Sequence, residues 1–424
     1  MRNATFWTEL LGLKDTVVVD VRLEGEGPAQ IVVIRVRPRT KAACRCSICG
    51  RKCPRYDRGD GVRRWRTLDV HMRRAFLEAE APRVHCPHHG VIVAAVPWAR
   101  PDAGHTLQFD DQVSWLAVHS SKSAVSQLMR VAWATVGAII TRVVADARAR
   151  ADPLANLRRI GIDEVSYKRG QRYITTVLDH DTGRVVWAAP GRDEYTLAKF
   201  FALLGPTRCW QIALVSADAG SWIANAVAAH CPNAKLCLDP FHVVSWATDA
   251  LDDVRRQVWN DARRHGQKAV AADIKGARWA LWRNAEDLSA REQAKLADIQ
   301  RSNDRLYRAY LLKEQLRQVF HAPVEEALGA PGDKLNPGLI DRWLAWARRC
   351  RIEPFVQLAK SIAKHRDAIR DALRHGLSNA RLESANTKVR LLTRVAFGFH
   401  SAHALVSLVL LNLGGFCPDL PGRA

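Results

Sequence analysis

The feature that most constrains this chain is the order of its strand-like and helix-like segments between residues 159 and 238. Three strand-like runs come first, and only short polar turns separate them, which predicts an antiparallel meander. Helix-like and strand-like segments then alternate. The predicted strands are 159–167, 172–179, 184–189, 212–216 and 234–238, and the predicted helices are 194–204 and 221–230. One sheet covered by helices accommodates all of these segments.

This order is the RNase H-like layout, and two aspartates belong to its first and fourth strands. Asp163 lies inside the first strand among apolar residues, and Asp218 directly follows the fourth. Because these strands are neighbours in an RNase H-like sheet, the two carboxylates should converge at one sheet edge. Such acids lose hydration and repel each other, and a divalent metal ion offsets both effects. The pair therefore predicts a metal site.

A third acid can arrive from a helix packed against that sheet. Glu383 falls early in a predicted helix that Ser378 or Asn379 can cap. At helical spacing it shares a face with Asn386 and Arg390. A surface glutamate that stabilises a helix start has the same place in a sequence. Spacing alone therefore leaves the role of Glu383 open.

Cysteines cluster near the start of the chain, where five of the ten fall between Cys44 and Cys86. Cys46 and Cys49 form one knuckle, and Cys86 and His89 form a second, with the spacing of tetrahedral zinc ligands. Strand-like runs separate the knuckles, so the pattern predicts a β-rich zinc ribbon with a structural zinc ion. Unliganded thiols are the alternative. Three further residues could replace a ligand: Cys44, Cys53 and His88.

The charge of the chain points to nucleic acid as a partner. Lys and Arg number 64 against 43 Asp and Glu, a net charge of +21, and such an excess attracts polyanions. A solvated basic surface, or a genome that favours arginine codons, gives the same composition. The basic residues expected to contact DNA are Arg63, Arg64, Arg66, Arg73, Arg74, Lys122, Arg130, Arg142, Lys388 and Arg390.

Residues 106–151 are predicted to be helical, with a short helix at 123–130, a break, and a longer helix at 134–148. This arrangement beside a basic stretch suits a helix-turn-helix that reads DNA. A helical hairpin that only packs domains together is the alternative.

From residue 241 onward the chain is predicted to be helical, and a Pro- and Gly-rich stretch at 323–337 interrupts it. Helices are expected at 255–264, 298–320, 339–349 and 355–375. Five tryptophans should fill a separate core: Trp259, Trp279, Trp282, Trp343 and Trp346. No apolar stretch reaches the roughly 18 residues that span a membrane, and no export leader is evident. A cytoplasmic, nucleoid-associated protein without a membrane partner is expected.

Several stretches together resemble the ISL-three family of insertion-sequence transposases, from end to end. They are Gly161-Ile-Asp-Glu, Asp179-His-Asp-Thr-Gly-Arg, Val215-Ser-Ala-Asp, Leu238-Asp-Pro-Phe-His-Val-Val, Arg308-Ala-Tyr-Leu-Leu-Lys-Glu and Ser378-Asn-Ala-Arg-Leu-Glu-Ser-Ala-Asn. The last stretch usually reads Ser-Asn-Gly, so Ala380 is a departure that favours helix. Many members end the second zinc knuckle with Cys rather than His89. By this resemblance the catalytic triad is Asp163, Asp218 and Glu383.

The resemblance also implies roles for Asp239 and His242. In DDE transposases with a large helical insertion, an acid or cysteine, two residues and a histidine often follow the fifth strand. Asp239 competes with Asp218 as the second metal ligand. Asp218 is favoured because it is the one that follows the fourth strand. His242 has either a catalytic role or the role of a buried histidine that holds a helix start.

The implied architecture is a multidomain α+β fold. Its expected parts are a β-rich zinc ribbon (1–105), a helix-turn-helix (106–152), the first part of an RNase H-like core (153–243), an all-helical insertion (244–376) and C-terminal core helices with the third acid (377–424).

The implied activity is metal-dependent DNA strand cleavage and strand transfer at the terminal inverted repeats of an insertion sequence. Mg²⁺ or Mn²⁺ would sit on the acids. The expected partners are double-stranded DNA, as element ends and target, and further copies of the chain in a homodimer or larger assembly. One alternative is a catalytically inactive DNA-binding regulator derived from a transposase. Another is a structure-selective nuclease with the same core. The presence of all three acids favours an enzyme.

Overall fold

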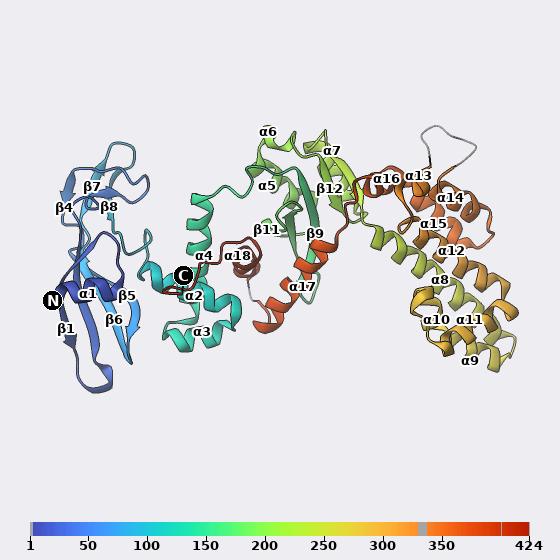
Figure 1. The fold of residues 1–424 in the computed structure, drawn as a ribbon, viewed down its shortest axis with the longest axis horizontal. Coiled ribbons are helices and arrows are strands. Elements are labelled where there is room, and N and C mark those ends of the chain that lie inside the picture. The colour runs from blue at the N-terminus through green and yellow to red at the C-terminus, as the bar shows by residue number, and fades with distance from the viewer. Residues whose placement is uncertain (1–2, 330–336, 400, 424) are drawn as a thin grey trace. The chain divides into compact units, whose positions relative to one another are not determined.

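The computed structural model describes residues 3–329, 337–399 and 401–423 (Figure 1). They form two compact units, one of Leu154–Arg390 and one of Met1–Pro153 with Leu391–Ala424. No single described helix is long and apolar enough to cross a membrane. The helices Lys122–Met129 and Trp133–Arg150 together have the length and composition of a span, but the chain bends by 101° between them.

The start of the chain folds into two four-stranded sheets. The first has the order β1-β2-β6-β5 and the second the order β3-β8-β7-β4. Helix α1 (Asn3–Leu11) packs on β1, and Trp65 and Trp98 meet edge to face in the core of the first sheet. The elements are β1 (Thr16–Glu24), η1 (Gly27–Ala29), β2 (Ile31–Pro38), β3 (Arg45–Cys46), β4 (Arg55–Asp57), β5 (Val62–Val70), β6 (Arg73–Glu80), β7 (Arg83–Cys86) and β8 (Gly90–Ala95).

Three helices follow in the same unit: α2 (Leu107–His119), α3 (Lys122–Met129) and α4 (Trp133–Arg150). The hydroxyl of Ser121 caps α3, and Arg130 in the left-handed conformation ends it. Helices α3 and α4 meet at 101°, which lies within the range of a helix-turn-helix. Helix α18 (Ala402–Leu413) packs against α4 and α2.

The second unit is built on a five-stranded sheet in the order β11-β10-β9-β12-β13. Strand β10 is antiparallel to β9 and β11, whereas β12 is parallel to β9 and β13. The order confirms the RNase H-like layout expected from the sequence. The elements are β9 (Arg159–Lys168), β10 (Arg172–Asp179), β11 (Val185–Pro190), α5 (Glu194–Leu204), α6 (Pro206–Cys209), β12 (Leu214–Ala217), α7 (Ser221–His230) and β13 (Lys235–Leu238).

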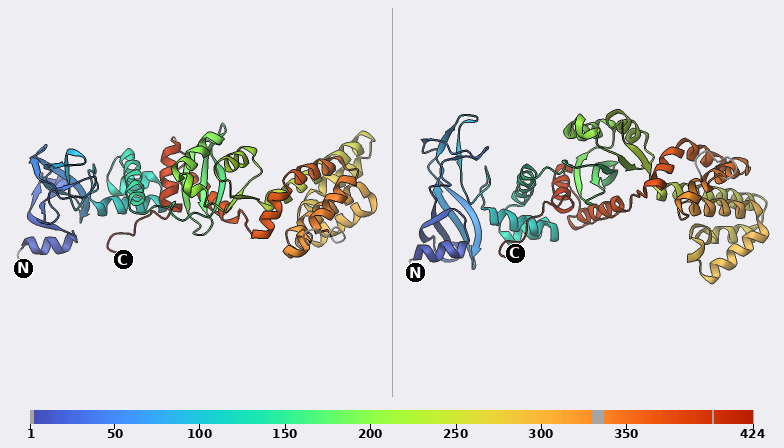
Figure 2. Two further views of the ribbon diagram at one scale, coloured as in Figure 1. Left: turned by 90° about the horizontal axis from the view of Figure 1, so that it is seen from above. Right: turned by 45° about the horizontal axis from the view of Figure 1, so that its top comes forward.

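A helical region with its own core follows β13 (Figure 2). Its elements are α8 (Pro240–Arg264), α9 (Lys268–Gly276), α10 (Arg278–Trp282), η2 (Ala285–Asp287), α11 (Ala290–Ser302), α12 (Asp304–Val319), α13 (Val324–Leu328), α14 (Leu339–Arg349), α15 (Glu353–Lys364) and α16 (Arg366–His375). The expected helices 298–320 and 355–375 are each two helices. The first of these is divided into α11 and α12, where the Asn303 side chain caps α12. The second is divided into α15 and α16 at His365. Of the Pro- and Gly-rich stretch, residues 330–336 lie outside the described residues.

The tryptophans of this helical region differ in burial. Trp343 is buried in the core, and Trp259, Trp282 and Trp346 are partly buried against it. Trp279 is 59% exposed, so its expected place in the core is wrong. Its ring lies edge to face with Trp282 at the surface, because the short helix α10 presents only one side to the core.

Helix α17 (Ala380–Val395) leaves the unit of the five-stranded sheet after Arg390 and continues into the other unit. Residues 377–424 were expected to belong to the RNase H-like core. In the structure the first part of α17 belongs to the sheet's unit, whereas α18 belongs with α2 and α4.

Candidate active site

Two aspartates meet where β9 and β12 run side by side. Ala217, the last residue of β12, pairs with Ile162 of β9, so Asp218 and Asp163 follow at the same level of two parallel strands. Asp163 accepts a hydrogen bond from the main-chain N–H of Glu164 at 2.7 Å. Burial raises the pKa of Asp163 to about 6, and the charge of Asp218 adds to this effect. The charge of Asp218 and the burial of Asp163 thus both disfavour the ionised form of Asp163.

Asp218 also contacts the start of the helical region. His242 on α8 lies 2.7 Å from Asp218, Nε2 to Oδ1, and this hydrogen bond raises the pKa of His242. Asp239 directly precedes α8 and is buried, which raises its pKa. The ligand atoms of Asp218, Asp239 and His242 lie within 4.8 Å of one another. Asp239 and His242, which follow β13, thus both lie next to Asp218.

Helix α17 brings two asparagines to these acids. Asn386 donates its side-chain N–H to Asp163 Oδ2, and Asn379 donates its side-chain N–H to Asp218 Oδ1 at 3.4 Å. The main-chain N–H of Asn379 also donates to Asp239 at 3.3 Å. Of the two residues expected to cap the helix, Asn379 does not do so with its side chain, because its amide oxygen accepts no hydrogen bond from the described residues.

Glu383 is an exposed residue of α17. It follows Asn379 by four residues and precedes Asn386 by three, so it lies between them on the helix surface. Both flanking side chains reach the strand acids, so Glu383 shares a stripe of the helix with two residues that bind those acids. Lys388 and Arg390 are exposed farther along the same helix.

Two further contacts fix how α17 lies on the sheet. Arg381 donates to the main-chain carbonyl of His180, and His180 Nε2 lies 2.7 Å from Ser216 Oγ on β12. The side chain of Leu382 fills the space over Gly161, where a Cβ atom would lie 2.5 Å from Leu382 Cδ1. Glycine at position 161 therefore allows the close approach of the helix.

The site contains several buried oxygens that lack a hydrogen-bond donor among the described residues. They are Glu164 Oε2, Asp239 Oδ2, Asn379 Oδ1 and Asn386 Oδ1. Buried polar atoms are nearly always paired, so each unpaired atom calls for an explanation. An oxygen-rich cluster of this kind fits hard divalent cations such as Mg²⁺ and Mn²⁺.

Glu164, Arg192 and Tyr173 also lie at this site, although no pattern in the sequence indicates a role for them. Arg192 pairs with Glu164, Nε to Oε1 at 2.7 Å, and its guanidinium lies over the ring of Tyr173. Burial raises the pKa of Glu164. Glu164 stands next to Asp163 in the sequence, which is the one signal that could have drawn attention to it.

The two cysteine knuckles come together at the start of the chain. The ligand atoms of Cys46, Cys49, Cys86 and His89 lie within 4.8 Å of one another. Cys49 Sγ lies 3.8 Å from Cys86 Sγ, and His89 Nδ1 lies 3.5 Å from both Cys46 Sγ and Cys86 Sγ. A tetrahedron with Zn–S of about 2.3 Å and Zn–N of about 2.1 Å has edges of about 3.8 and 3.6 Å. The four atoms thus have the spacing of a zinc site.

The three residues considered as replacement ligands lie outside this group of four. The thiol of Cys53 donates to the carbonyl of Arg51 at 3.3 Å. Cys44 adopts a left-handed backbone conformation with φ of 56°. The ring of His88 lies 6.4 Å from that of His89.

Two of the arginines expected to contact DNA on β5 are bonded to acids. Arg64 pairs with Glu24 and Glu78, each at 2.9 Å. Arg66 is buried and pairs with Asp69, and burial lowers its pKa to about 10. Arg66 therefore serves the interior of the sheet domain.

Four other arginines of the front part lie at the surface or donate to nearby atoms. Arg63 and Arg130 donate to main-chain carbonyl oxygens at 2.9 and 3.0 Å, and Arg73 donates to the side chain of Gln30 at 2.9 Å. Arg74 is exposed on the same hairpin as Arg73. This hairpin keeps basic groups at the surface.

The basic residues of the helix-turn-helix are held in different ways. Arg142 on α4 binds the buried Asp110 of α2 with two hydrogen bonds of 3.0 and 3.1 Å, so it joins two helices. The ammonium of Lys122 lies 3.3 Å from the ring centroid of Trp133. Trp133 is 50% exposed and begins α4. The N-terminal end of α4 thus presents an aromatic ring and a cation together.

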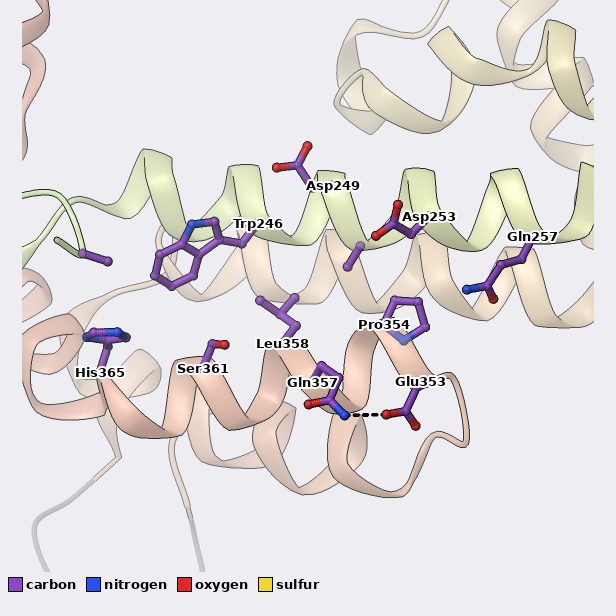
Figure 3. A pocket seen from close by; sticks show the side chains of 12 residues that line it. Trp246, Asp249, Asp253, Gln257, Glu353, Pro354, Gln357, Leu358, Ser361 and His365 are labelled. Atoms are coloured by element: carbon purple, nitrogen blue, oxygen red, sulfur yellow. Dashed lines mark hydrogen bonds between the residues drawn. The ribbon is translucent and has the colours of Figure 1, made fainter. Parts of the chain in front are cut away.

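A groove of about 600 Å³ lies between α8 and α15 (Figure 3). Trp246 and Leu358 face each other across it, and Asp249, Asp253 and Glu353 stand along its sides. Acidic groups at this density repel phosphate, so the groove does not suit a DNA backbone.

Three stretches of the chain match known protein families. Residues 160–409 match a family described as "Transposase". Residues 94–144 match the "Helix-turn-helix domain of transposase family ISL3". Residues 42–89 match the "zinc-finger of transposase IS204/IS1001/IS1096/IS1165".

Two relatives are similar along most of their length. The transposase for insertion sequence element IS1557 of Mycobacterium tuberculosis is 55% identical over 445 residues, which cover 100% of this chain and 98% of the relative. The transposase for insertion sequence element IS1001 of Bordetella parapertussis is 26% identical over 377 residues, covering 88% of this chain and 89% of the relative.

A zinc ribbon, a helix-turn-helix and an RNase H-like sheet with acids at its edge define a transposase, an enzyme that acts on DNA. The resemblance seen in the sequence is confirmed. The chain belongs to the ISL3 family of insertion-sequence transposases.

Proposed function

We propose that this transposase cuts DNA at the terminal inverted repeats of its element and joins the ends to target DNA by a DDE two-metal mechanism. The observation that carries the proposal is that Asp163 and Asp218 lie on neighbouring strands and interact electrostatically. Glu383 follows one acid-binding asparagine and precedes another, which supports its assignment as the third acid. The unpaired buried oxygens around the acids support a site for cations.

Asp163, Asp218 and Glu383 would hold two divalent ions, Mg²⁺ or Mn²⁺. Metals bound there supply activation of a water or a DNA 3′-hydroxyl and stabilisation of the leaving oxygen. Asp218 is the preferred second ligand because its charge acts directly on Asp163. His242 orients Asp218 through its 2.7 Å contact, and Asp239 lies within reach of the same ion.

The front parts of the chain, 1–105 and 106–152, would bind the element ends. Zinc held by Cys46, Cys49, Cys86 and His89 would fix the ribbon. The exposed start of α4 and the β5–β6 hairpin, together with Lys388 and Arg390, offer basic groups to phosphate. Because transposition couples two element ends, we propose a homodimer or larger assembly on DNA. A bacterial cytoplasmic, nucleoid-associated protein fits these partners.

The test is a cleavage assay on a labelled end duplex with Mg²⁺ or Mn²⁺, beside a gel shift on the same DNA. Asp163→Asn, Asp218→Asn and Glu383→Gln keep side-chain shape and remove a charge that the metals need. Each is expected to abolish cleavage and strand transfer while end binding survives. Asp249→Asn, on α8 but outside the acid cluster, is the matched control and should cleave normally.

Other outcomes would change the assignment in defined ways. Cleavage by Asp218→Asn with loss of activity in Asp239→Asn would exchange the two aspartates. Full cleavage by all three triad variants would end the DDE proposal. End binding without any cleavage by the unaltered protein would favour the regulator derived from a transposase.

A further inference from the structure

Asn379, which directly precedes α17, and Asn386 within it bind different acids on either side of Glu383. Asn379 contacts Asp218 and Asp239 through its side-chain and main-chain N–H groups. About two helical turns later, Asn386 contacts Asp163. The segment from Asn379 to Asn386, which carries Glu383, is therefore tied at both ends to the acids of the sheet.

Both carboxamides are almost fully buried, with 2% of Asn379 and 4% of Asn386 exposed. Each uses its N–H group, whereas each amide oxygen is buried and has no donor among the described residues. A buried amide with half of its hydrogen-bonding capacity unmet does not favour folding. Stability of the helix alone therefore does not account for asparagine at these two positions.

The packing of α17 does not require these asparagines. Arg381 already binds the carbonyl of His180, and Leu382 already packs onto Gly161. Both residues lie inside the segment between Asn379 and Asn386. The contacts of the asparagines instead select the orientation of each acid.

The chemistry of the carboxamide suits this task. A lysine or arginine at either position would neutralise the acids and compete with a cation, and another acid would add to their repulsion. A neutral amide can donate to a carboxylate without removing its charge. Its free oxygen can also accept a hydrogen bond from a metal-bound water or bind the cation directly.

We propose that Asn379 and Asn386 are positioning residues of the metal site: each orients one strand acid, presents its amide oxygen to the hydrated cation, and together they set Glu383 between the acids. This inference rests on the proposed DDE function. Residues that orient metal ligands typically change metal affinity or activity by 10- to 100-fold when replaced. Neither asparagine is expected to act on the DNA itself.

The experiment uses the full-length protein with Asn379→Ala and Asn386→Ala, and with Ser384→Ala and Thr387→Ala as controls at exposed positions of the same helix. Binding of Mn²⁺ is measured from the electron paramagnetic resonance signal of the free ion. Cleavage of a labelled end duplex is measured against Mn²⁺ concentration. Alanine favours helix, so Asn386→Ala keeps the test valid if Asn379→Ala, at the helix start, fails to fold.

Each asparagine variant is expected to bind Mn²⁺ about 10-fold or more weakly and to regain part of its cleavage at high Mn²⁺, whereas both controls behave like the unaltered protein. Glu383→Gln should not regain cleavage at any Mn²⁺ concentration. Unchanged Mn²⁺ affinity in Asn386→Ala, with or without loss of cleavage, overturns the inference. Absence of Mn²⁺-dependent cleavage in the unaltered protein would instead count against the DDE function.

Discussion

Alanine at position 161 should test how closely α17 must approach the sheet. In the structure a Cβ atom on Gly161 would lie 2.5 Å from Leu382 Cδ1 and 2.9 Å from His180 Nε2. Carbon atoms in contact are about 3.5–4.0 Å apart, so the Leu382 side chain, or the helix that carries it, must shift by about 1 Å. His180 cannot easily yield, because Ser216 holds its ring.

The size of the effect follows from this displacement. A reacting group misplaced by about 1 Å can cost about 10²-fold in rate, so Gly161→Ala should slow end cleavage by about two orders of magnitude. Overpacking of this kind costs about 1–3 kcal/mol of stability. Binding to end DNA should be unchanged, because the substitution lies in the unit of the five-stranded sheet, outside the zinc ribbon and the helix-turn-helix.

A double-mutant cycle with Leu382→Ala provides the internal control. Leu382 is buried, so its truncation alone also lowers stability. In the double variant the space left by Leu382 admits the new methyl group, and the two free-energy changes should couple by about 1–2 kcal/mol. Cleavage rates and thermal denaturation are measured for all four proteins. Normal cleavage by Gly161→Ala, or strictly additive stability changes, would refute the close-approach argument.

Two further predictions concern the metal sites. Purified protein should hold about one zinc per chain, and Cys49→Ser should release it while Cys44→Ser retains it, as measured by elemental analysis; zinc retained in Cys49→Ser would contradict the assigned ligands. In buffer free of divalent cations, Asp163→Asn should stabilise the protein at pH 8 by at most about 3 kcal/mol, because a pKa raised from 3.8 to about 6 penalises the ionised form in the folded state. This penalty is absent below pH 3.8 and complete above about pH 6, so denaturation at pH 4 should show no such gain.

The five-stranded sheet could be predicted because its signals are local. Apolar runs, polar turns and amphipathic helices lie within short windows, and helices α5 and α7 begin and end where the sequence places them. Asp163 and Asp218 could be paired because the strand order makes β9 and β12 neighbours. The pairing of Asp163 with Asp218 could therefore be predicted from the order of the strands rather than from any single motif.

The contacts of the asparagines and arginines could not be predicted in the same way. Asn379 precedes a helix, which indicates a cap, and its partner Asp218 lies 161 residues earlier in the chain. Arg66 and Arg142 count as basic charge in the sequence, but Asp69 and the buried Asp110 bind them in the fold. Long-range pairing decides these roles, and local propensity carries no information about it.

The order of elements along the chain has a consequence for incomplete copies of the protein. Helices α17 and α18 follow the elements that they pack on, since α17 contributes Asn386 to the acids of the sheet and α18 covers α2 and α4. A nascent chain therefore completes both units only when translation has passed Leu413. A stop codon or frameshift before α17 removes Glu383, the proposed third acid, together with the helix that packs on α2 and α4. A decayed gene copy is thus expected to leave no stable DNA-binding fragment that could act as a dominant-negative inhibitor of intact transposase.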